Sequence, residues 1–404
     1  MRRVVITGVG AISALGLDRA EFWHRLCLGE SGIGPIQQAD VSTIRFKNGA
    51  EVRGYDPKQY FEPKHLGFMN RFAQFAVVAA REAVKMAGVE WTPELQDSTA
   101  IVTGACIGGR GSDESAYREL FTYNRNRVHP LTIPLSMENA GASHISIEFG
   151  IQGPTFTIST ACSSASHAIG QAFWMVRSGA VSMAITGGSE APMFYGGLKA
   201  WEAMRVVSSD TCRPFSADRS GMILGEGGAM LVLEPLETAL ARGVQPLAEI
   251  VGFGMSSDAF HITQPRQNGP EKAMRSALRD AHLAPEEIGY INAHGTATNV
   301  NDQMEARAIH AVFGERAGSL PVSSTKSMHG HTLGASGAIE AVATVLALRN
   351  GVLPPTANYS KPDPACALDV IPNVARKQAV EFALSNSFAF GGLNAVLAFR
   401  AYRS

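Results

Sequence analysis

The sequence has 404 residues, of which 45% are apolar and 18% charged, and its formal net charge is −1. This length is enough for two or three average domains or for one large layered α/β unit, and the near-neutral charge gives no reason to expect binding to nucleic acid or to a membrane surface. The five cysteines are scattered without CxxC spacing, which argues against a disulfide framework or a zinc site and for a reducing compartment.

The beginning of the chain does not resemble a signal peptide. Met1-Arg-Arg3 is followed only by a short Val- and Ile-rich run and then by glycines. No apolar run elsewhere approaches the ~20 residues that are needed to cross a bilayer. We therefore expect a cytoplasmic protein.

Short Val- and Ile-rich runs, several of them followed directly by glycine, alternate along the chain with Ala-rich amphipathic stretches. The runs predict strands and the stretches predict helices. The expected strands include 4–7, 101–104, 183–188 and 229–233, and the expected helices include 71–87 and 271–281. This alternation predicts an α/β protein with a mostly parallel or mixed sheet that is buried by helices. No Pro/Ser-rich linker divides the chain, which favours a single compact unit.

Cys162 lies at a predicted junction between a strand and a helix. The β-branched residues of 154–160 predict a buried strand, and the small and apolar residues of 165–177 predict a helix. At the first turn of a helix, unpaired N–H groups and the positive end of the helix dipole favour a thiolate. Cys162 is thus a candidate for covalent catalysis, although a lone cysteine can also be a small buried apolar residue.

The sequence around Cys162 is similar to a second segment later in the chain. Ser159-Thr-Ala-Cys162 is similar to Ser324-Thr-Lys-Ser327, and each segment precedes a long apolar helix. Those helices end in the similar sequences Arg177-Ser-Gly and Arg349-Asn-Gly. The distance along the chain from this segment to the end of the helix is seven residues longer in the second copy, so the second copy needs an insertion. By itself this is weak evidence for an internal duplication.

Three further segments contain side chains that suit catalysis. A predicted strand delivers His294 into a loop of Gly and Thr residues, and Lys326 and His331 lie five residues apart in a turn of small residues. Near the C-terminus, adjacent glycines in 388–394 allow a tight turn whose N–H groups could stabilise an oxyanion. Together with Cys162 these residues form a specific set, although each one alone is a modest signal.

Several ordered motifs resemble those of one enzyme family. They are Arg3-Val-Val-Ile-Thr-Gly-Val-Gly, Thr160-Ala-Cys-Ser-Ser, Arg213-Pro-Phe-Ser-Ala-Asp-Arg-Ser-Gly, Asn292-Ala-His-Gly-Thr, Ser323-Ser-Thr-Lys-Ser-Met-His-Gly-His and Phe390-Gly-Gly. By these motifs the chain resembles, from end to end, the β-ketoacyl-acyl-carrier-protein synthases of type II, which are condensing enzymes of the thiolase superfamily. The resemblance implies a duplicated five-layer α-β-α-β-α sandwich with halves 1–245 and 246–404, normally assembled as a homodimer.

The resemblance also implies a reaction and a role for each candidate residue. Cys162 would accept an acyl chain from acyl carrier protein, and malonyl carrier protein would lose CO2 to give an enolate that attacks the acyl thioester. His294 and His331 would donate hydrogen bonds to the enolate oxygen. Lys326 would hold His331 and Glu305 in place. The catalytic set is completed by the gating Phe390, whose backbone N–H would form a second oxyanion hole together with that of Cys162.

Further residues are implied by resemblance alone, and no cofactor is implied for the reaction. Thr296 and Thr298 would bind the pantetheine arm. The expected substrate-binding residues are Ile107, Glu138, His261, Thr296, Thr298, Glu305 and Gly391. The expected docking residues for the acidic carrier protein are Lys64, Arg125, Arg127 and Arg205. Asn292, Glu340, Ser385 and Asn386 match a structural cation site of some relatives.

Some positions depart from the pattern of the housekeeping enzymes. Ala389-Phe-Gly-Gly-Leu393 replaces Gly-Phe-Gly-Gly-Thr, which suggests altered gating. Gly67-Phe68 replaces basic residues and suggests a dedicated carrier protein. Glu138 falls where apolar groups usually line the acyl tunnel, where a buried carboxylate is costly unless it is paired. Other stretches resemble the nodulation-factor and polyene-forming ketosynthases, which favours specialised acyl-chain synthesis over primary fatty-acid elongation.

Several alternatives share part of the pattern. A thiolase would carry a second catalytic cysteine in its C-terminal glycine loop, and 388–394 has none. A chain-length-factor subunit would lack the nucleophile, but such a protein could be the partner of this chain in a heterodimer. A cysteine hydrolase would need neither the second histidine nor Lys326. A type III condensing enzyme would carry Asn in place of His331.

Overall fold

The computed structural model describes residues 2–403, and the strands of these residues form one large mixed sheet and two small two-stranded sheets. The first half of the chain contains β1 (Val4–Ser13), β2 (Gly34–Pro35), β3 (Asn48–Gly49), β4 (Thr99–Gly104), β5 (Thr155–Ile158), β6 (Met183–Glu190) and β7 (Gly227–Pro235). The second half contains β8 (Ala248–Ser257), β9 (Ile288–Asn292), β10 (Pro321–Ser323), β11 (Val352–Leu353), β12 (Asp369–Val370), β13 (Arg376–Lys377), β14 (Phe382–Ala389) and β15 (Leu393–Ala401).

The helices cover both faces of this sheet. They are α1 (Arg19–Leu28), α2 (Pro63–Leu66), α3 (Arg71–Ala87), α4 (Pro93–Ser98), α5 (Arg110–Phe121), α6 (Thr132–Ser136), α7 (Ala140–Phe149), α8 (Ser164–Ser178), α9 (Tyr195–Met204), α10 (Leu236–Ala241), α11 (Asn268–Ala281), α12 (Asn299–Phe313), α13 (Lys326–His329) and α14 (Ser336–Asn350). None of the helices within residues 2–403 combines the length and the apolar character that a membrane span requires.

The two halves have the same strand order and the same strand directions. In the first half the order is β1-β7-β6-β4-β5, and in the second half it is β8-β15-β14-β9-β10, with β12 added at the edge. In each half the first two pairings are antiparallel and the last two are parallel. The halves join where the beginning of β1 pairs with the beginning of β8. The predicted duplication is therefore confirmed, while the exact boundary at 245/246 stays a prediction.

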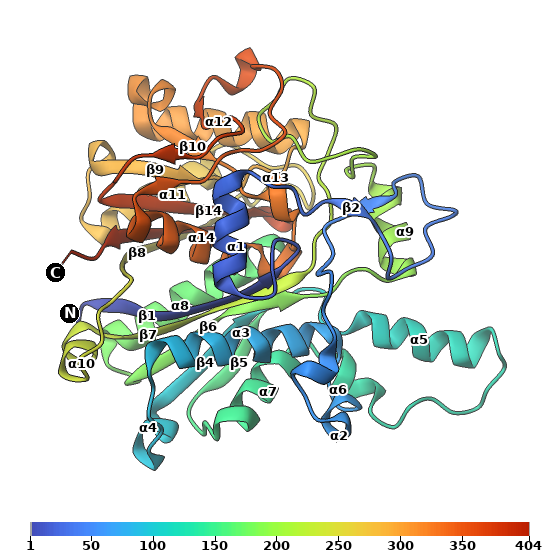
Figure 1. Ribbon diagram of the computed structural model, residues 1–404. Coiled ribbons are helices and arrows are strands. Elements are labelled where there is room, and N and C mark those ends of the chain that lie inside the picture. The colour runs from blue at the N-terminus through green and yellow to red at the C-terminus, as the bar shows by residue number, and fades with distance from the viewer. Residues whose placement is uncertain (1, 404) are drawn as a thin grey trace.

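Five layers follow from the packing of the helices (Figure 1). The helix α3 covers the outer face of the first half of the sheet, and α11 covers the outer face of the second half. Between the two halves lie α8 and α14, which contact each other and the strands on both sides. Their apolar residues belong to one continuous core. The predicted α/β five-layer sandwich is thus confirmed.

Local sequence signals explain how the outer helix α3 is delimited. The side chain of Asn70 accepts a hydrogen bond from the N–H of Phe72 at the beginning of the helix, and Gly88 ends it in the left-handed conformation with φ +57°. The buried alanines, valines and phenylalanines between these residues let α3 lie close to the sheet. The predicted helix 71–87 is therefore confirmed, because both its ends and its buried face are encoded locally.

The strand predicted at 154–160 forms as β5, but the prediction that it is buried is wrong for the single chain. β5 is the last strand of the first half and pairs only with β4. Its four residues are exposed or half-buried. β-Branched residues indicate an extended backbone, but whether a strand lies at the centre or at the edge of a sheet depends on tertiary packing.

The structure around the two central helices, α8 and α14, confirms the similarity between the two sequence segments that precede them. Both contain 15 residues, and each is preceded by a short 3-10 turn, which is Ala161–Ser163 before α8 and Leu333–Ala335 before α14. In both turns the first residue has the unusual φ of +50°. The turn begins three residues after the end of β5 but ten residues after the end of β10. The second copy therefore contains the expected seven-residue insertion, and this insertion includes α13.

Candidate active site

Cys162 lines a pocket of about 290 Å³. Cys162 belongs to the turn that leads into α8 and is only 7% exposed. The turn is fixed by the hydroxyl of Ser163, which donates to the carbonyls of Thr160, at 2.9 Å, and Leu393, at 3.0 Å. The second bond ties the cysteine turn of the first half to β15 of the second half.

The pKa of the Cys162 thiol is raised to about 11 because the side chain is buried. The charge of Lys326 and the backbone N–H groups of Phe390 and Cys162 itself oppose this effect. The prediction of a helix-stabilised thiolate is therefore wrong for the resting protein, since desolvation outweighs the favourable groups. The nucleophile rests as a thiol and must lose its proton during attack.

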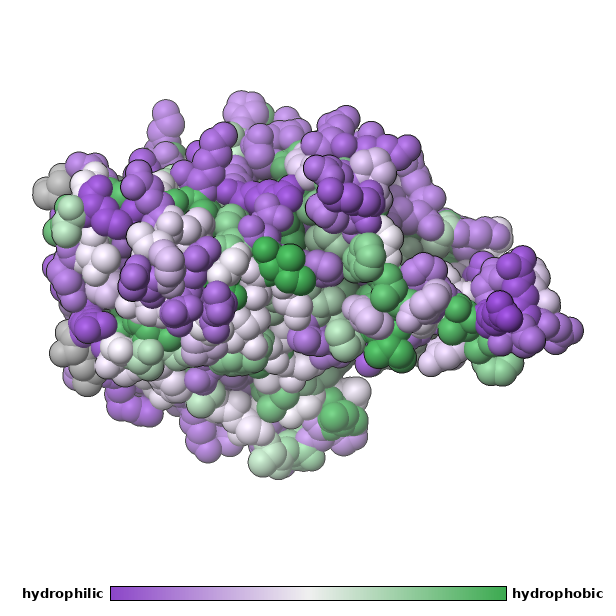
Figure 2. Space-filling model, turned by 90° about the horizontal axis from the view of Figure 1, so that it is seen from below, coloured by the Kyte–Doolittle hydropathy of each residue, from purple (hydrophilic) through white to green (hydrophobic). Residues whose placement is uncertain are grey.

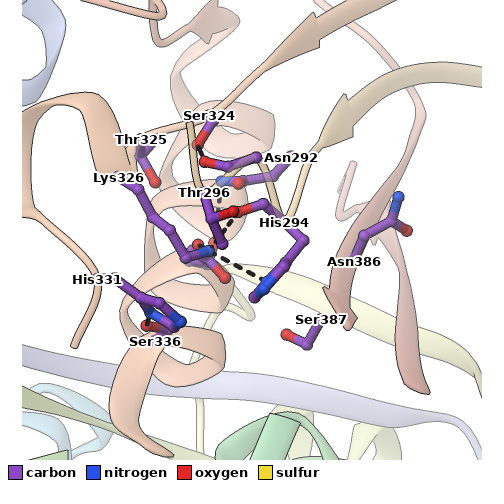
Figure 3. Close-up of polar contacts among 12 residues, drawn as sticks. Asn292, His294, Thr296, Ser324, Thr325, Lys326, His331, Ser336, Asn386 and Ser387 are labelled. Carbon is purple, nitrogen blue, oxygen red and sulfur yellow. Dashed lines mark hydrogen bonds and ion pairs between the residues drawn. The ribbon is translucent and has the colours of Figure 1, made fainter. Parts of the chain in front are cut away.

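Two buried imidazoles, those of His294 and His331, face the same pocket (Figure 3). Their rings are 5.4 Å apart between centroids and nearly perpendicular, at 84°. Burial and, after it, the charge of Lys326 hold the pKa of both imidazoles well below 6.5, so both are neutral at pH 7. Neutral imidazole has one N–H donor and one acceptor nitrogen.

The hydrogen-bond partners indicate which ring nitrogen carries the proton in each histidine. The Nζ of Lys326 lies 3.4 Å from Nδ1 of His294, and the backbone N–H of Leu333 donates to Nδ1 of His331 over 3.3 Å. An ammonium and a backbone N–H are donors only, so both Nδ1 atoms are acceptors. Each Nε2 therefore carries the hydrogen, and the site presents two N–H donors.

Lys326 is completely buried and forms an ion pair with Glu340. Its ammonium also donates to the carbonyl of His294 over 2.6 Å. The prediction that Lys326 holds His331 and Glu305 is wrong: Glu305 instead accepts from the N–H groups of His294 and Gly295, both at 2.8 Å. The sequence did not reveal this arrangement because Glu340 lies 14 residues after Lys326, on a separate helix, α14.

The glycine-rich loop between β14 and β15 closes one side of the pocket. Gly391 and Gly392 have φ values of +83° and +70°, which favour glycine. The N–H of Gly391 donates to the carbonyl of Ile262 over 2.7 Å, and that of Asp258 donates to the carbonyl of Gly392 over 2.9 Å. The loop thereby directs the Phe390 backbone N–H toward Cys162.

The structure brings many of the predicted residues to this pocket. Its lining includes Cys162, Arg205, His261, His294, Thr296, Thr298, His331, Phe390 and Gly391. The hydroxyls of Thr296 and Thr298 lie 2.9 Å apart. Lys326 and Glu305 lie behind the lining, where they contact His294. The predictions for these residues thus define one connected site.

Ile107 and Glu138 do not line this pocket. Ile107 is half-buried and packs in a neighbouring apolar cluster that includes Leu333. Glu138 is half-buried as well, and its backbone and side chain lie against Gly108, next to Ile107. The proximity of the two residues to each other agrees with a common role, which stays a prediction.

Of the four predicted docking residues, Arg205 lies at the pocket. Lys64 and Arg125 are exposed and form ion pairs with nearby acidic residues, Glu62 and Glu119. Arg127 is also exposed. Neither the two paired residues nor Arg127 belongs to the lining of the pocket, and the docking role of all four stays a prediction.

Four buried polar atoms on neighbouring elements have no hydrogen-bond partner within the described residues. They are Oδ1 of Asn292, Oε2 of Glu340, Oγ of Ser385 and Oδ1 of Asn386. Unpaired buried oxygens are costly, and such a set of neutral and carboxylate oxygens suits a hard cation. These are the four residues that the sequence resemblance indicated, so they fit the group that it implies.

Two residues of the site were missed by sequence reasoning. Glu190, at the end of β6, is completely buried and accepts from the N–H groups of Cys106, Ile107 and Gly108. Trp201 on α9 lines the pocket. The Gly-Gly-Ser-Glu sequence at the end of a predicted strand could have indicated Glu190, whereas no local signal distinguishes Trp201 from a surface aromatic residue.

A buried cysteine and two neutral imidazoles, supplied by the two halves of a duplicated sandwich, define a thiolase-fold condensing enzyme. The chain belongs to the β-ketoacyl synthase family: the family's N-terminal domain matches residues 1–239 and its C-terminal domain matches residues 247–360. The family predicted from the sequence motifs is thus confirmed, and the protein is an enzyme.

The similar proteins include nodulation proteins and 3-oxoacyl-[acyl-carrier-protein] synthases. The chain is 48% identical to a nodulation protein E of Rhizobium sp. (strain N33), over 99% of each chain. It is 40% identical to 3-oxoacyl-[acyl-carrier-protein] synthase 2 of Staphylococcus aureus (strain COL), over 100% of this chain and 99% of that protein. The solved ishigamide ketosynthase/chain length factor is 36% identical, with a TM-score of 0.95 and coverage of 100% of both chains.

Proposed function

We propose that the enzyme condenses an acyl group held on Cys162 with malonyl-acyl carrier protein, giving β-ketoacyl-acyl carrier protein and CO2. The observation that carries this proposal is the single pocket that contains a thiol and two imidazole Nε2–H donors, those of His294 and His331. The thiol provides covalent catalysis, and the two donors suit a developing oxyanion.

In the first half-reaction, the sulfur of Cys162 bonds to the carbonyl carbon of the incoming acyl thioester. The bond to the pantetheine sulfur breaks, and that sulfur takes up the proton that Cys162 loses. Negative charge develops on the carbonyl oxygen, where the backbone N–H groups of Cys162 and Phe390 stabilise it. This pair of donors fits because both already act on the sulfur.

In the second half-reaction, the bond between the malonyl α-carbon and the carboxylate breaks. The electron pair forms an enolate whose oxygen accepts hydrogen bonds from His294 and His331. The α-carbon then bonds to the acyl carbon, and the sulfur of Cys162 leaves as a thiolate that takes up a proton from solvent water. The low pKa of the imidazoles keeps them neutral, so they act as hydrogen-bond donors.

Lys326 acts on this step through its neighbours. Its charge helps to keep both imidazoles neutral and makes the site electropositive. Its bonds to the ring and the carbonyl of His294 fix the orientation of that imidazole. The reaction needs no cofactor, and a cation at Asn292, Glu340, Ser385 and Asn386 would stabilise the fold around Lys326 and β14.

The proposed carrier is an acyl carrier protein that is met at the pocket entrance. Arg205 lines this entrance, and the name of the similar Staphylococcus enzyme includes the same carrier. The sequence differs from the pattern of the housekeeping enzymes at Gly67-Phe68 and at Ala389-Phe-Gly-Gly-Leu393. These differences support specialised acyl-chain synthesis with a dedicated carrier protein. The 48% identity to a nodulation protein E supports the same assignment.

We also propose that the enzyme works as a dimer, formed through the face around β5. Among the strands of residues 2–403, this one ends the sheet with an unpaired edge, and Figure 2 shows hydrophobic side chains at several places on the lower face of the molecule. The large apolar side chains that are exposed on α5, α6, α7 and β5 include Tyr117, Phe121, Ile133, Ile147 and Phe156, of which Ile147 is 76% exposed. An exposed apolar patch beside a free strand edge favours association. The partner is a second copy of this chain or a chain-length factor. The similar ishigamide structure is named for a ketosynthase together with a chain length factor, which supports the second partner.

Intact-protein mass spectrometry tests the function directly. The wild-type enzyme and Cys162→Ala are incubated with acyl carrier proteins of graded chain length and with malonyl carrier protein. An acyl adduct on the wild type only, with a product two carbons longer, is the expected result. An adduct that forms only when a chain-length-factor subunit is added identifies the heterodimer. No adduct under either condition contradicts the proposed reaction.

A further inference from the structure

Two branched apolar side chains are exposed at the mouth of the pocket that contains Cys162. Ile262, in the segment that follows β8, is 71% exposed, and Val300, in the first turn of α12, is 60% exposed. Both residues also line the pocket, so they lie at its opening. Single exposed apolar residues are common on protein surfaces, but these two come from separate segments and border the same opening. They therefore form an apolar area around the route to the thiol.

Both side chains start from a fixed backbone. The carbonyl of Ile262 accepts a hydrogen bond from the N–H of Gly391 over 2.7 Å. Val300 lies in α12, which begins directly after Thr298. A partner that binds here has little backbone to order, and this lowers the entropic cost of association.

A cation without an acidic partner lies at the same opening. Arg205 is exposed and lines the pocket. It forms no ion pair within residues 2–403: the acidic residues nearest to it along the chain, Glu202 and Asp210, pair with Lys199 and Arg213 instead. The charge of Arg205 is therefore available to an acidic partner.

A second exposed cation, Arg266, directly follows the lining residue Pro265. Its guanidinium carbon lies 3.7 Å from the centroid of the exposed ring of Phe260. This contact orients the guanidinium without neutralising it, and no carboxylate of the described residues forms an ion pair with it. Lys64 and Arg125 differ in this respect, since both are paired with nearby acids.

We propose that the acyl carrier protein docks on this mouth surface, which consists of Ile262, Val300, Arg205 and Arg266. The inference rests on the proposed function, in which the acyl group reaches Cys162 on an arm that stays attached to the carrier protein. The carrier protein must therefore rest against the opening while the arm is inside. The apolar pair forms the dry centre of the contact, and the two arginines attract the acidic carrier.

The two parts of the mouth surface have different consequences for the choice of carrier. Charge attracts any acidic carrier protein, and it mainly raises the rate of association. The apolar side chains of Ile262 and Val300 select a carrier protein whose surface presents matching apolar groups, because a polar surface would lose its hydration there without compensation. The mouth surface thus accounts for a preference for a dedicated carrier protein.

The rate of Cys162 acylation at several concentrations of acyl carrier protein gives a maximal rate and a half-saturating concentration, both followed by intact mass spectrometry. We expect Ile262→Ser and Val300→Ser each to raise the half-saturating concentration about tenfold, the loss expected when one branched aliphatic side chain is no longer buried by a partner. The maximal rate is expected to stay unchanged, because the reacting groups are left as they are.

Acyl-pantetheine provides the decisive comparison, because it carries the same arm and acyl group without the carrier protein. The wild type, Ile262→Ser and Val300→Ser should be acylated by it at equal rates. Val374→Ser is the matched control, since Val374 is 75% exposed but does not line the pocket. This control should behave as the wild type with both substrates.

Reversal of charge tests the arginines. Arg266→Glu should raise the half-saturating concentration of acyl carrier protein about tenfold at low ionic strength and by less at high ionic strength, because salt screens exposed charges. Arg279→Glu is the matched control, since Arg279 is exposed on α11 and borders a different cavity. It should leave acylation unchanged at both ionic strengths.

Three outcomes would overturn the inference. The first is an unchanged half-saturating concentration in Ile262→Ser and Val300→Ser. The second is an equal loss with acyl-pantetheine, which would assign the two side chains to the arm. The third is a change of oligomeric state in mass photometry, which would make the surface an interface between copies of this chain.

Failure of docking and failure of the proposed function give different results with the wild-type enzyme. An adduct with acyl-pantetheine but with no acyl carrier protein contradicts docking and leaves the acyl chemistry intact. An adduct with neither substrate, with or without a partner subunit, contradicts the proposed function itself.

Discussion

The turns before α8 and α14 have the same shape but opposite roles. In the first half the middle residue of the turn is Cys162, which faces the pocket. In the second half it is Gly334, where an added Cβ would lie 2.6 Å from Oε1 of Glu190 and 2.9 Å from the nitrogen of Cys106. One copy of the turn therefore presents a nucleophile, whereas the other is packed against backbone and can carry no side chain.

The loops that follow β4 and β9 form a second matched pair. Each is held by a buried carboxylate that accepts from consecutive backbone N–H groups: Glu190 holds the loop that begins at Cys106, and Glu305 holds the loop at His294. Burial raises the pKa of both carboxyl groups to about 7. The carboxylates come from different elements, β6 and α12, so the two halves hold these loops by the same kind of contact, but only the second loop delivers an imidazole to the pocket.

The insertion before α14 accounts for the remaining difference. It contains Lys326 and His331, which have no counterpart in the two residues between β5 and the turn of Cys162. The comparison teaches that duplication supplied two similar frames. The active site combines the turn of the first half, which presents Cys162, with the inserted segment of the second half, which brings His331 to the same pocket. Four experiments test this division.

The largest effect is expected from Lys326→Met. This change leaves the carboxylate of Glu340 buried without its partner, and removal of one member of a buried pair costs about 3–5 kcal/mol in the free energy of unfolding. Urea denaturation measures the loss. The double variant Lys326→Met/Glu340→Leu should regain most of the stability without regaining condensation. A single variant as stable as the wild type would show that the insertion does not depend on this pair.

The imidazoles of the second half should act on one half-reaction only. His294→Ala and His331→Ala should each lower condensation by about 10²–10³, because each removes one oxyanion donor. Acylation of Cys162 should change far less, since its backbone donors lie on other residues. Product formation and adduct formation are measured separately by mass spectrometry. An equal loss in acylation and in condensation would show that the two halves of the protein do not act on separate half-reactions.

Gly334→Ala probes the closed turn of the second copy. The added methyl group would overlap with Glu190 and the backbone at Cys106, so we expect a loss of about 1–3 kcal/mol in the free energy of unfolding. Gly318→Ala is the matched control, because no atom lies within 4 Å of its added Cβ. Thermal denaturation of the two variants gives the comparison. Equal stabilities would mean that the turn can accept a side chain after all.

The buried carboxyl groups of Glu190 and Glu305 should make the free energy of unfolding depend on pH. Their pKa is about 7 in the folded protein against an ordinary value of 4.5. Between these values the folded state keeps a proton that the unfolded state has lost, so stability falls as the pH rises from 4.5 to 7, by about 1 kcal/mol per pH unit for each group. Glu190→Gln and Glu305→Gln should each reduce this slope in denaturation series. An unchanged slope would show that the two groups are ionised throughout.

Much of the fold was predictable because its signals are local. Asn70 and Gly88 delimit α3 at the predicted residues, and the repeated small-residue turns revealed both the duplication and its seven-residue insertion. The residues of the pocket were found as motifs, because a reaction centre needs glycine and small neighbours around Cys162, His294 and His331. Their meeting in one pocket followed from the family resemblance alone.

Only the tertiary structure decided how these residues behave. β5 is exposed because it lies at the end of the sheet, and the thiol of Cys162 has a raised pKa because the fold buries it more strongly than the helix favours its charge. Lys326 pairs with Glu340, and Trp201 meets Phe390. Strand position, desolvation and these contacts join elements that are far apart in the sequence, so no local pattern encodes them. The sequence by itself determined the elements and the reacting groups, and packing determined their partners and their protonation.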